Sequence, residues 1–173
     1  MILKTPNLTL VPQPPQHLLA LGQGEDDYRT ISGVRVAGGV REFLLAASPD
    51  FFAKLHQFSE PDPWRFGFAV VHTAQNLVIG LCGFTGPPRS DGIVEIAYSI
   101  APDYQGKGYA TEVAQALVEF ASRDARVRTI RAHTLPEKNA STRILEKCGF
   151  QKAGETIDPE TSAAVWRWEK PAE

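Results

Sequence analysis

The pattern of hydrophobic and polar positions changes character near residue 66 of this chain. Before that point, apolar residues recur at helical spacing in short segments; after it, alternating or continuous apolar runs indicate strands. The early segments predict helices over 14–21, 40–47 and 49–58, with Asp50 as N-cap of the last, and a loop over 22–33. The predicted strands span 7–12, 66–72, 77–84, 93–100, 127–135, 150–155 and 162–169, and the later helices span 107–122 and 139–149.

The order of these elements predicts one mixed α/β domain over 1–173, of the α+β class. Strands 66–72, 77–84 and 93–100 follow one another through short turns, which is typical of an antiparallel meander. We therefore expect a central, mostly antiparallel mixed sheet of about six to seven strands flanked by helices.

Composition narrows the functional classes. Hydrophobic residues make up 43% of the chain and charged residues 22%, and the formal net charge is -2, which argues against nucleic-acid binding by bulk charge. The cysteines Cys82 and Cys148 lie far apart without metal-ligand spacing, so we expect no metal site. No apolar run approaches the roughly 20 residues of a membrane span, and the first residues lack a secretory pattern. A cytoplasmic protein with no membrane partner is expected.

The segment Gln105-Gly106-Lys107-Gly108-Tyr109 links a strand to a helix. Backbone N–H groups in the first turn of a helix lack intrahelical partners and favour anions, and glycines allow a phosphate to approach closely. An ordinary helix entry with loop glycines is the alternative. Neither a G-x-x-x-x-G-K-[ST] loop nor a G-x-G-x-x-G fingerprint is present, so both nucleotide-binding hypotheses are weaker.

This loop resembles the Q/R-x-x-G-x-G/A loop of the GCN5-related N-acetyltransferase (GNAT) superfamily. Two further stretches resemble the same family, "EIAYSIAPDYQGKGYATE" and "EKNASTRILEKCGFQKAGE", and the beginning "TPNLTLVP" resembles the branch of ribosomal-protein N-terminal acetyltransferases. The likeness is strong over 66–155, the implied cofactor-binding core, and weak over 13–60, where acceptors are chosen. It implies a GNAT-like fold whose splayed strands form an acetyl-CoA cleft.

The resemblance also implies a set of cofactor-binding residues. Main-chain groups of Tyr98, Ser99 and Ile100 are implied to hold the pantetheine arm of acetyl-CoA, and the amides of Gln105, Gly106, Lys107, Gly108, Tyr109 and Ala110 its diphosphate. Asn139 is implied to hydrogen-bond the arm, with simple capping of helix 139–149 as the alternative. Lys107 either adds charge or is only solvated.

Acetyl transfer to an amine requires a neutral amine. A lysine amine titrates near 10.4 and a chain N-terminus near 7.7 to 8.0, so an N-terminal acceptor needs only a modest base. Glu95 shares one face of strand 93–100 with small and apolar neighbours, which makes an unpartnered carboxylate costly unless it faces a wet cleft. Glu95 is therefore the candidate base, with a structural ion pair as the alternative.

The leaving thiolate needs at most a weak acid. Ser141, two residues after Asn139, is the candidate, against an ordinary serine at a helix start. His133 and Cys148 are interpreted as structural residues rather than as proton shuttle and nucleophile.

The activity that these residues indicate is direct transfer of acetyl from acetyl-CoA to an amine, with a non-catalytic acyl-CoA sensor as the alternative. A protein N-terminus and a small-molecule amine both stay open as acceptor. We expect 13–60 and the final hairpin, near Trp64, Trp166 and Trp168, to choose it, and the chain to be a monomer or homodimer.

Overall fold

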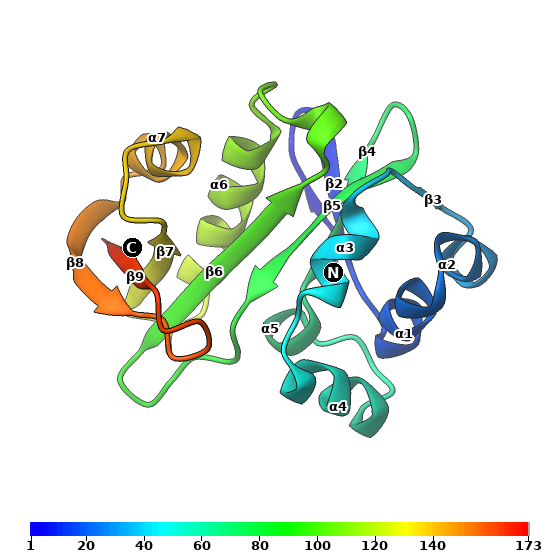
Figure 1. Ribbon diagram of the computed structural model, residues 1–173, viewed down its shortest axis with the longest axis horizontal. Helices are drawn as coiled ribbons and strands as arrows, with labels where there is room; N and C mark the ends of the chain where they lie inside the picture. The colour runs from blue at the N-terminus through cyan, green and yellow to red at the C-terminus, as the bar shows by residue number, and fades with distance from the viewer. Residues whose placement is uncertain (173) are drawn as a thin grey trace.

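The computed structural model describes residues 1–172 and shows a twisted open sheet with helices on both faces (Figure 1). The sheet has nine strands within these residues, in the order β1-β2-β4-β5-β6-β7-β9-β8, with β3 beside β5. Neighbouring strands are antiparallel except for β6–β7 and β3–β5. The strands are β1 (Leu3–Lys4), β2 (Leu8–Pro12), β3 (Arg35–Val36), β4 (Phe68–His72), β5 (Leu77–Phe84), β6 (Ile93–Ile100), β7 (Thr129–Thr134), β8 (Gln151–Ile157) and β9 (Ala164–Pro171).

Seven α-helices and one 3-10 turn are present in the same residues. They are α1 (Pro15–Gln23), α2 (Glu25–Ser32), α3 (Val40–Leu45), α4 (Pro49–Gln57), α5 (Pro63–Phe66), η1 (Pro102–Tyr104), α6 (Tyr109–Ser122) and α7 (Ala140–Lys147). None of them combines the length and the apolar character needed to cross a bilayer. Glu173, the last residue of the expected domain, lies outside the described residues.

The expected fold class is confirmed, and most expected elements are present within a few residues of their predicted bounds. The loop expected over 22–33 is wrong, because Glu25–Ser32 forms α2. Three acidic residues in its first turn complement the positive end of the helix dipole, and Gly33 ends the helix in a left-handed conformation. The sheet has more strands than expected because the two-residue strands β1 and β3 carry no recognisable periodicity.

The N-cap expected at Asp50 is also wrong. The side chain of Ser48 accepts the hydrogen bond from the Phe51 N–H, and Pro49 occupies the first helical position of α4. Asn139 does cap α7 as expected, and Gly149 has φ +89, which matches its expected role in stopping that helix.

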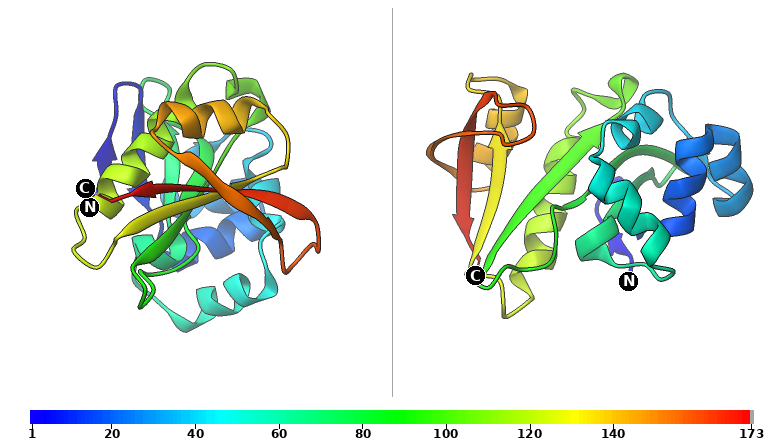
Figure 2. Two further views of the ribbon diagram at one scale, coloured as in Figure 1. Left: turned by 90° about the vertical axis from the view of Figure 1, so that its left-hand side faces the viewer. Right: turned by 60° about the horizontal axis from the view of Figure 1, so that its bottom comes forward.

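The two faces of β6 have different neighbours. Val94, Ile96 and Ile100 are buried on the face that packs against α6, whose buried stripe comprises Val113, Ala114, Ala116, Leu117 and Ala121. Ser99 and Ala97 lie on the opposite face, toward α3. The sheet therefore has α6 and α7 on one face and α1 to α4 on the other (Figure 2). α5 also contacts α6, because the ring centres of Trp64 and Phe120 are 5.1 Å apart.

Candidate acetyl-CoA site

The parallel strands β6 and β7 separate after three paired positions. Only Ile93–Glu95 of β6 has partners on β7, at Thr129–Arg131, although both strands continue further. The right-hand view of Figure 2 shows the two strands close at one end and far apart at the other. Beyond Glu95, no strand within residues 1–172 pairs with the edge of β6 that faces β7.

The register with β5 decides which main-chain groups point into this opening. Thr85 donates its N–H to Glu95 O, and Ala101 donates its N–H to Ile79 O, so the odd-numbered residues of β6 bond toward β5. The main-chain groups of Ile96 and Tyr98 therefore face the opening, whereas those of Ser99 face β5. The carbonyl of Ile100 also faces the opening but accepts a hydrogen bond of 2.9 Å from the Gln105 side chain.

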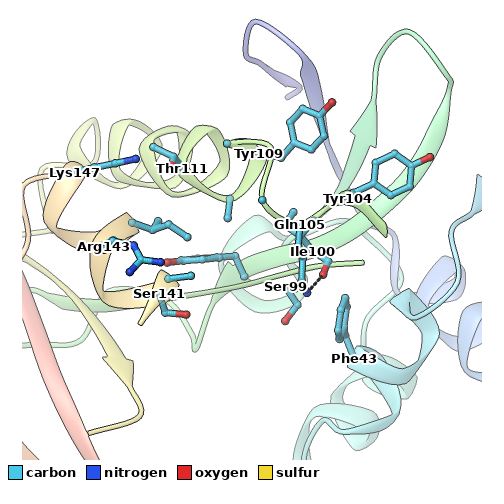
Figure 3. A pocket seen from close by; sticks show the side chains of 16 residues that line it. Phe43, Ser99, Ile100, Tyr104, Gln105, Tyr109, Thr111, Ser141, Arg143 and Lys147 are labelled. Carbon is cyan, nitrogen blue, oxygen red and sulfur yellow. Dashed lines mark hydrogen bonds between the residues drawn. The ribbon is translucent and has the colours of Figure 1, made fainter. Parts of the chain in front are cut away.

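A cavity of about 500 Å³ lies beside this opening. Figure 3 shows α7 side chains on one of its sides, Phe43 of α3 on another, and the glycine loop between them. Of the expected site residues, the cavity is lined by Tyr98, Ser99, Ile100, Gln105, Gly106, Gly108, Tyr109, Ala110 and Ser141. Its lining does not include Lys107, Asn139 or Glu95.

The glycine loop presents unpaired donors to this cavity. Gly106 and Gly108 have φ angles of +75 and +85, in the left-handed region that favours glycine, and a Cβ on either would meet no atom within 4 Å. Within residues 1–172, no hydrogen bond uses the N–H groups of residues 106–108, and those of 109–111 are the first three of α6 and lack intrahelical partners. The N–H of Gln105, by contrast, donates to Pro102 O at 3.3 Å.

Two tyrosines fasten the loop to the β4–β5 turn. The Tyr104 hydroxyl donates to Gln75 Oε1 at 2.6 Å, and the Tyr109 hydroxyl lies 3.1 Å from Nε2 of His72. Lys107 places its ammonium 5.5 Å from the centre of the Tyr104 ring. These long-range contacts hold the loop amides in place, and the loop sequence alone gave no sign of the partners His72 and Gln75.

Helix α7 brings positive charge to the other side of the cavity. Arg143 and Lys147 line it together with Ser141 (Figure 3). The spacing of four residues between Arg143 and Lys147 places them on one helix face, and this spacing is visible in the sequence. Residues of this type at the entrance of an anion site add Coulomb attraction to the neutral amides of the loop.

Asn139 is occupied in a reciprocal cap at the start of α7. Its Oδ1 accepts from the Thr142 N–H at 3.1 Å, and its own N–H donates to Thr142 Oγ1 at 3.0 Å. The amide nitrogen of the Asn139 side chain takes part in none of the hydrogen bonds among the described residues. The capping alternative is therefore present in the structure, and a donor remains for a second role.

Glu95 is not part of the cavity wall; it is the last residue of β6 that pairs with β7, three positions before Tyr98 of that wall. Its Oε1 is 2.9 Å from Nδ1 of His133 on β7, and both side chains are partly exposed. Glu95 lines a separate hollow of about 170 Å³ with Arg131, whose guanidinium is held by Glu169 at 2.7 Å. The His133 partner was not foreseen, because it is reached across the β6–β7 pair.

Burial raises the pKa of three groups around the site. It raises the pKa of the Tyr98 hydroxyl far above its usual value, with a smaller contribution from the nearby Cys148. It likewise raises the pKa of the thiols of Cys82 and Cys148, and in Cys148 the nearby Lys170 opposes that effect. Both cysteines are buried and unpaired, in agreement with their interpretation as core residues.

Comparison with known proteins agrees with this geometry. The sequence profile described as "Acetyltransferase (GNAT) domain" matches residues 21–151. An uncharacterized N-acetyltransferase p20 of Bacillus licheniformis is 34% identical over 52% of this chain and 49% of its own length. The ribosomal protein uS5-alanine N-acetyltransferase of Escherichia coli is 28% identical over 59% of this chain and 53% of its own length. The chain thus matches about half the length of these curated relatives.

Solved structures share the fold across the whole chain. An acetyltransferase of the GNAT family from Bacillus anthracis superposes with a TM-score of 0.67 at 20% identity, covering 99% of both chains. A ribosomal L7/L12 alpha-N-protein acetyltransferase in complex with coenzyme A gives a TM-score of 0.66 at 18% identity, covering 99% of this chain and 98% of the other. Because the family profile covers well over half of the sequence, this chain belongs to the acetyltransferase (GNAT) domain family.

Proposed function

We propose that the protein transfers an acetyl group from acetyl-CoA to a primary amine. The observation that carries this proposal is the run of N–H groups over 106–111 that have no partner among residues 1–172. Apart from Lys107, the residues of this run line one cavity together with the cations Arg143 and Lys147. Amides of a helix start and basic side chains form a site suited to a diphosphate. Acetyl-CoA supplies the thioester that carries the acetyl group.

The pantetheine arm of the cosubstrate carries amides, which need hydrogen-bond partners. The opening between β6 and β7 offers the main-chain groups of Ile96 and Tyr98, in the manner of an added strand. The side-chain amide of Asn139 is a further donor for the arm. Of the three strand residues first expected, Tyr98 is best placed, while Ser99 and Ile100 have most of their main-chain groups occupied.

The proton of the attacking amine has a proposed route to Glu95. Because Glu95 is the last residue of β6 that pairs with β7, three positions before Tyr98 of the cavity wall, we infer that one or more water molecules connect it to the amine. Its 2.9 Å contact with Nδ1 of His133 involves one carboxylate oxygen and leaves the other to accept the proton. Glu95 then has a functional role in addition to the observed pairing.

The leaving group has a proposed donor in Ser141, which lines the cavity and is exposed to solvent. As the new C–N bond forms and the C–S bond breaks, the hydroxyl protonates the thiolate and regains a proton from water. A thiol has an ordinary pKa near 8.5, so this proton contributes about 2 kcal/mol at most at neutral pH. Loss of Ser141 is therefore expected to slow turnover without abolishing it.

Isothermal titration calorimetry with acetyl-CoA, ATP and NAD in parallel tests the binding half of the proposal. We expect acetyl-CoA alone to bind. A thiol-release assay on a panel of amines tests the chemistry, with Glu95→Gln as the active-site variant and Glu155→Gln, an exposed residue of β8, as the matched control. Glu95→Gln should lower kcat and leave the Kd for acetyl-CoA unchanged. Binding without turnover on any amine would favour a non-catalytic acyl-CoA sensor.

A further inference from the structure

A second cavity, of about 190 Å³, adjoins the acetyl-CoA cavity. The two share Phe43, Tyr98 and Ser99 in their walls, so they meet at the splayed end of β6. The second cavity lies on the face of the sheet that carries the early helices, opposite α6. A molecule bound there has access to the acetyl-CoA cavity without leaving the protein surface.

The floor of this cavity is made of small residues. Ala97 and Ser99 of β6 stand in register with Gly83 and Leu81 of β5, so the four share one face of the sheet. Gly83 cannot carry a side chain here, because a Cβ would lie 2.8 Å from the Cα of Gly67. Gly67 fills the space above Gly83, so the open part of the floor results from the short side chains of Ala97 and Ser99.

The walls are apolar and carry no negative charge. Leu18, Leu44, Phe51 and Phe66 line the cavity, and its lining contains no aspartate or glutamate. The charged group in the lining is Arg65, whose Nη1 lies 2.6 Å from Asp62 and whose guanidinium lies 5.2 Å from the centre of the Phe58 ring. A polycationic acceptor would lose hydration here without gaining a carboxylate partner.

We propose that this cavity selects an acceptor whose primary amine is carried on an uncharged apolar group of about the size of a leucyl or phenyl side chain. The inference rests on the proposed acetyltransferase function. An apolar cavity of roughly 150 Å³ is large enough to bind a benzene ring. Burial of such a group removes apolar surface from water, and one missing methylene already changes selectivity by about tenfold or more.

The test is a comparison of kcat/KM across amines in the thiol-release assay at saturating acetyl-CoA. Leucinamide and phenylalaninamide should exceed glycinamide and spermidine by about tenfold or more. A tripeptide that begins with leucine and the simple amine isoamylamine then show whether the apolar group belongs to a peptide or to a small molecule. Faster turnover of spermidine or glycinamide would overturn the inference and leave the proposed acetyl transfer intact. Acetylation of no amine at all would overturn both.

A cavity-filling variant locates the selectivity. Ala97 is exposed on the floor, so Ala97→Leu should fill the cavity without disturbing the buried face of β6. We expect the preference for leucinamide over glycinamide to fall by about tenfold, while the Kd for acetyl-CoA is retained. Ala153→Leu, at an exposed alanine of β8 away from both cavities, is the matched control and should keep the full preference. An unchanged preference in Ala97→Leu would refute the assignment.

Discussion

Replacing Gly106 or Gly108 with alanine should have two separate effects, one on the stability of the fold and one on the affinity for coenzyme A. Gly106 and Gly108 have φ angles of +75 and +85, and an added Cβ on either meets no protein atom within 4 Å. The substitution therefore lowers the free energy of unfolding only through the strained backbone conformation and not through a steric clash. A left-handed non-glycine residue costs about 1–2 kcal/mol, and the stiffer unfolded chain returns about 0.4–1 kcal/mol. The expected net loss is about 1 kcal/mol, or a fall in Tm of about 2–4 °C.

The cost to the ligand is larger, because the same open space is part of the acetyl-CoA cavity. A Cβ that keeps a phosphate from one amide removes a hydrogen bond to a charged group, which contributes about 1.5–3 kcal/mol. The Kd for coenzyme A should then rise about ten- to hundredfold in Gly106→Ala and Gly108→Ala. Calorimetry with coenzyme A measures this, and scanning calorimetry of the free proteins measures the Tm.

Gly33 offers a control with the same backbone conformation. It has φ +78, an added Cβ there also meets nothing within 4 Å, and it lies at the end of α2, outside the cavity lining. Gly33→Ala should lower the Tm by a similar amount and bind coenzyme A like the unmodified protein. The reasoning is refuted if the Tm falls by the same amount in all three variants and none of them binds coenzyme A more weakly. The loop amides would then not hold the diphosphate.

Three further predictions concern single side chains. Arg143→Gln should raise the Kd for coenzyme A about fivefold and weaken the dependence of that Kd on salt, because an exposed ion pair contributes up to about 1 kcal/mol. The control Arg29→Gln should change neither the Kd nor its salt dependence. Cys82 and Cys148 should resist Ellman's reagent at pH 8 in the folded protein, since burial raises the pKa of both thiols, and rapid labelling of either would contradict this. Burial acts to raise the pKa of Glu112, but hydrogen bonds from Asn7 and Thr5 outweigh it and lower that pKa. The stabilisation from Glu112 should thus be present above its unfolded-state pKa and disappear as pH falls through the folded-state pKa, and Glu112→Gln should flatten this pH dependence in urea titrations.

Periodicity located the elements that carry strong alternation or a clear apolar stripe. Strand 93–100 was predicted with the bounds that β6 has, and the helix after the glycine loop was placed within two residues of α6 at its start. The helix α2 was missed because its surface is polar nearly throughout, and only Tyr28 in it is buried. A short helix of this kind is stabilised by packing on its neighbours, which no window of local sequence reports.

The glycine loop could be found in the sequence because its chemistry is local: consecutive residues supply consecutive amides. Other parts of the site depend on chain segments that are distant in sequence. Phe43 comes from α3, Arg143 and Lys147 from α7, and His133 reaches Glu95 from a different strand. No spacing rule within a short window connects these residues, so their assembly had to come from the topology.

The opening between β6 and β7 lies where regular strand pairing ends, so the periodicity of the sequence does not reveal it. The alternation in 93–100 predicts a strand with two faces, but it is silent on which edge of that strand lacks a neighbour. Once the strand order is known, the accounting of main-chain donors and acceptors becomes decisive. The odd residues of β6 bond to β5, the pairing of β6 with β7 ends at Glu95, and the Gln105 side chain donates to the carbonyl of Ile100. The groups left at Ile96 and Tyr98 need a partner that is not part of the sheet, and under the proposed function the amide-bearing arm of acetyl-CoA is that partner.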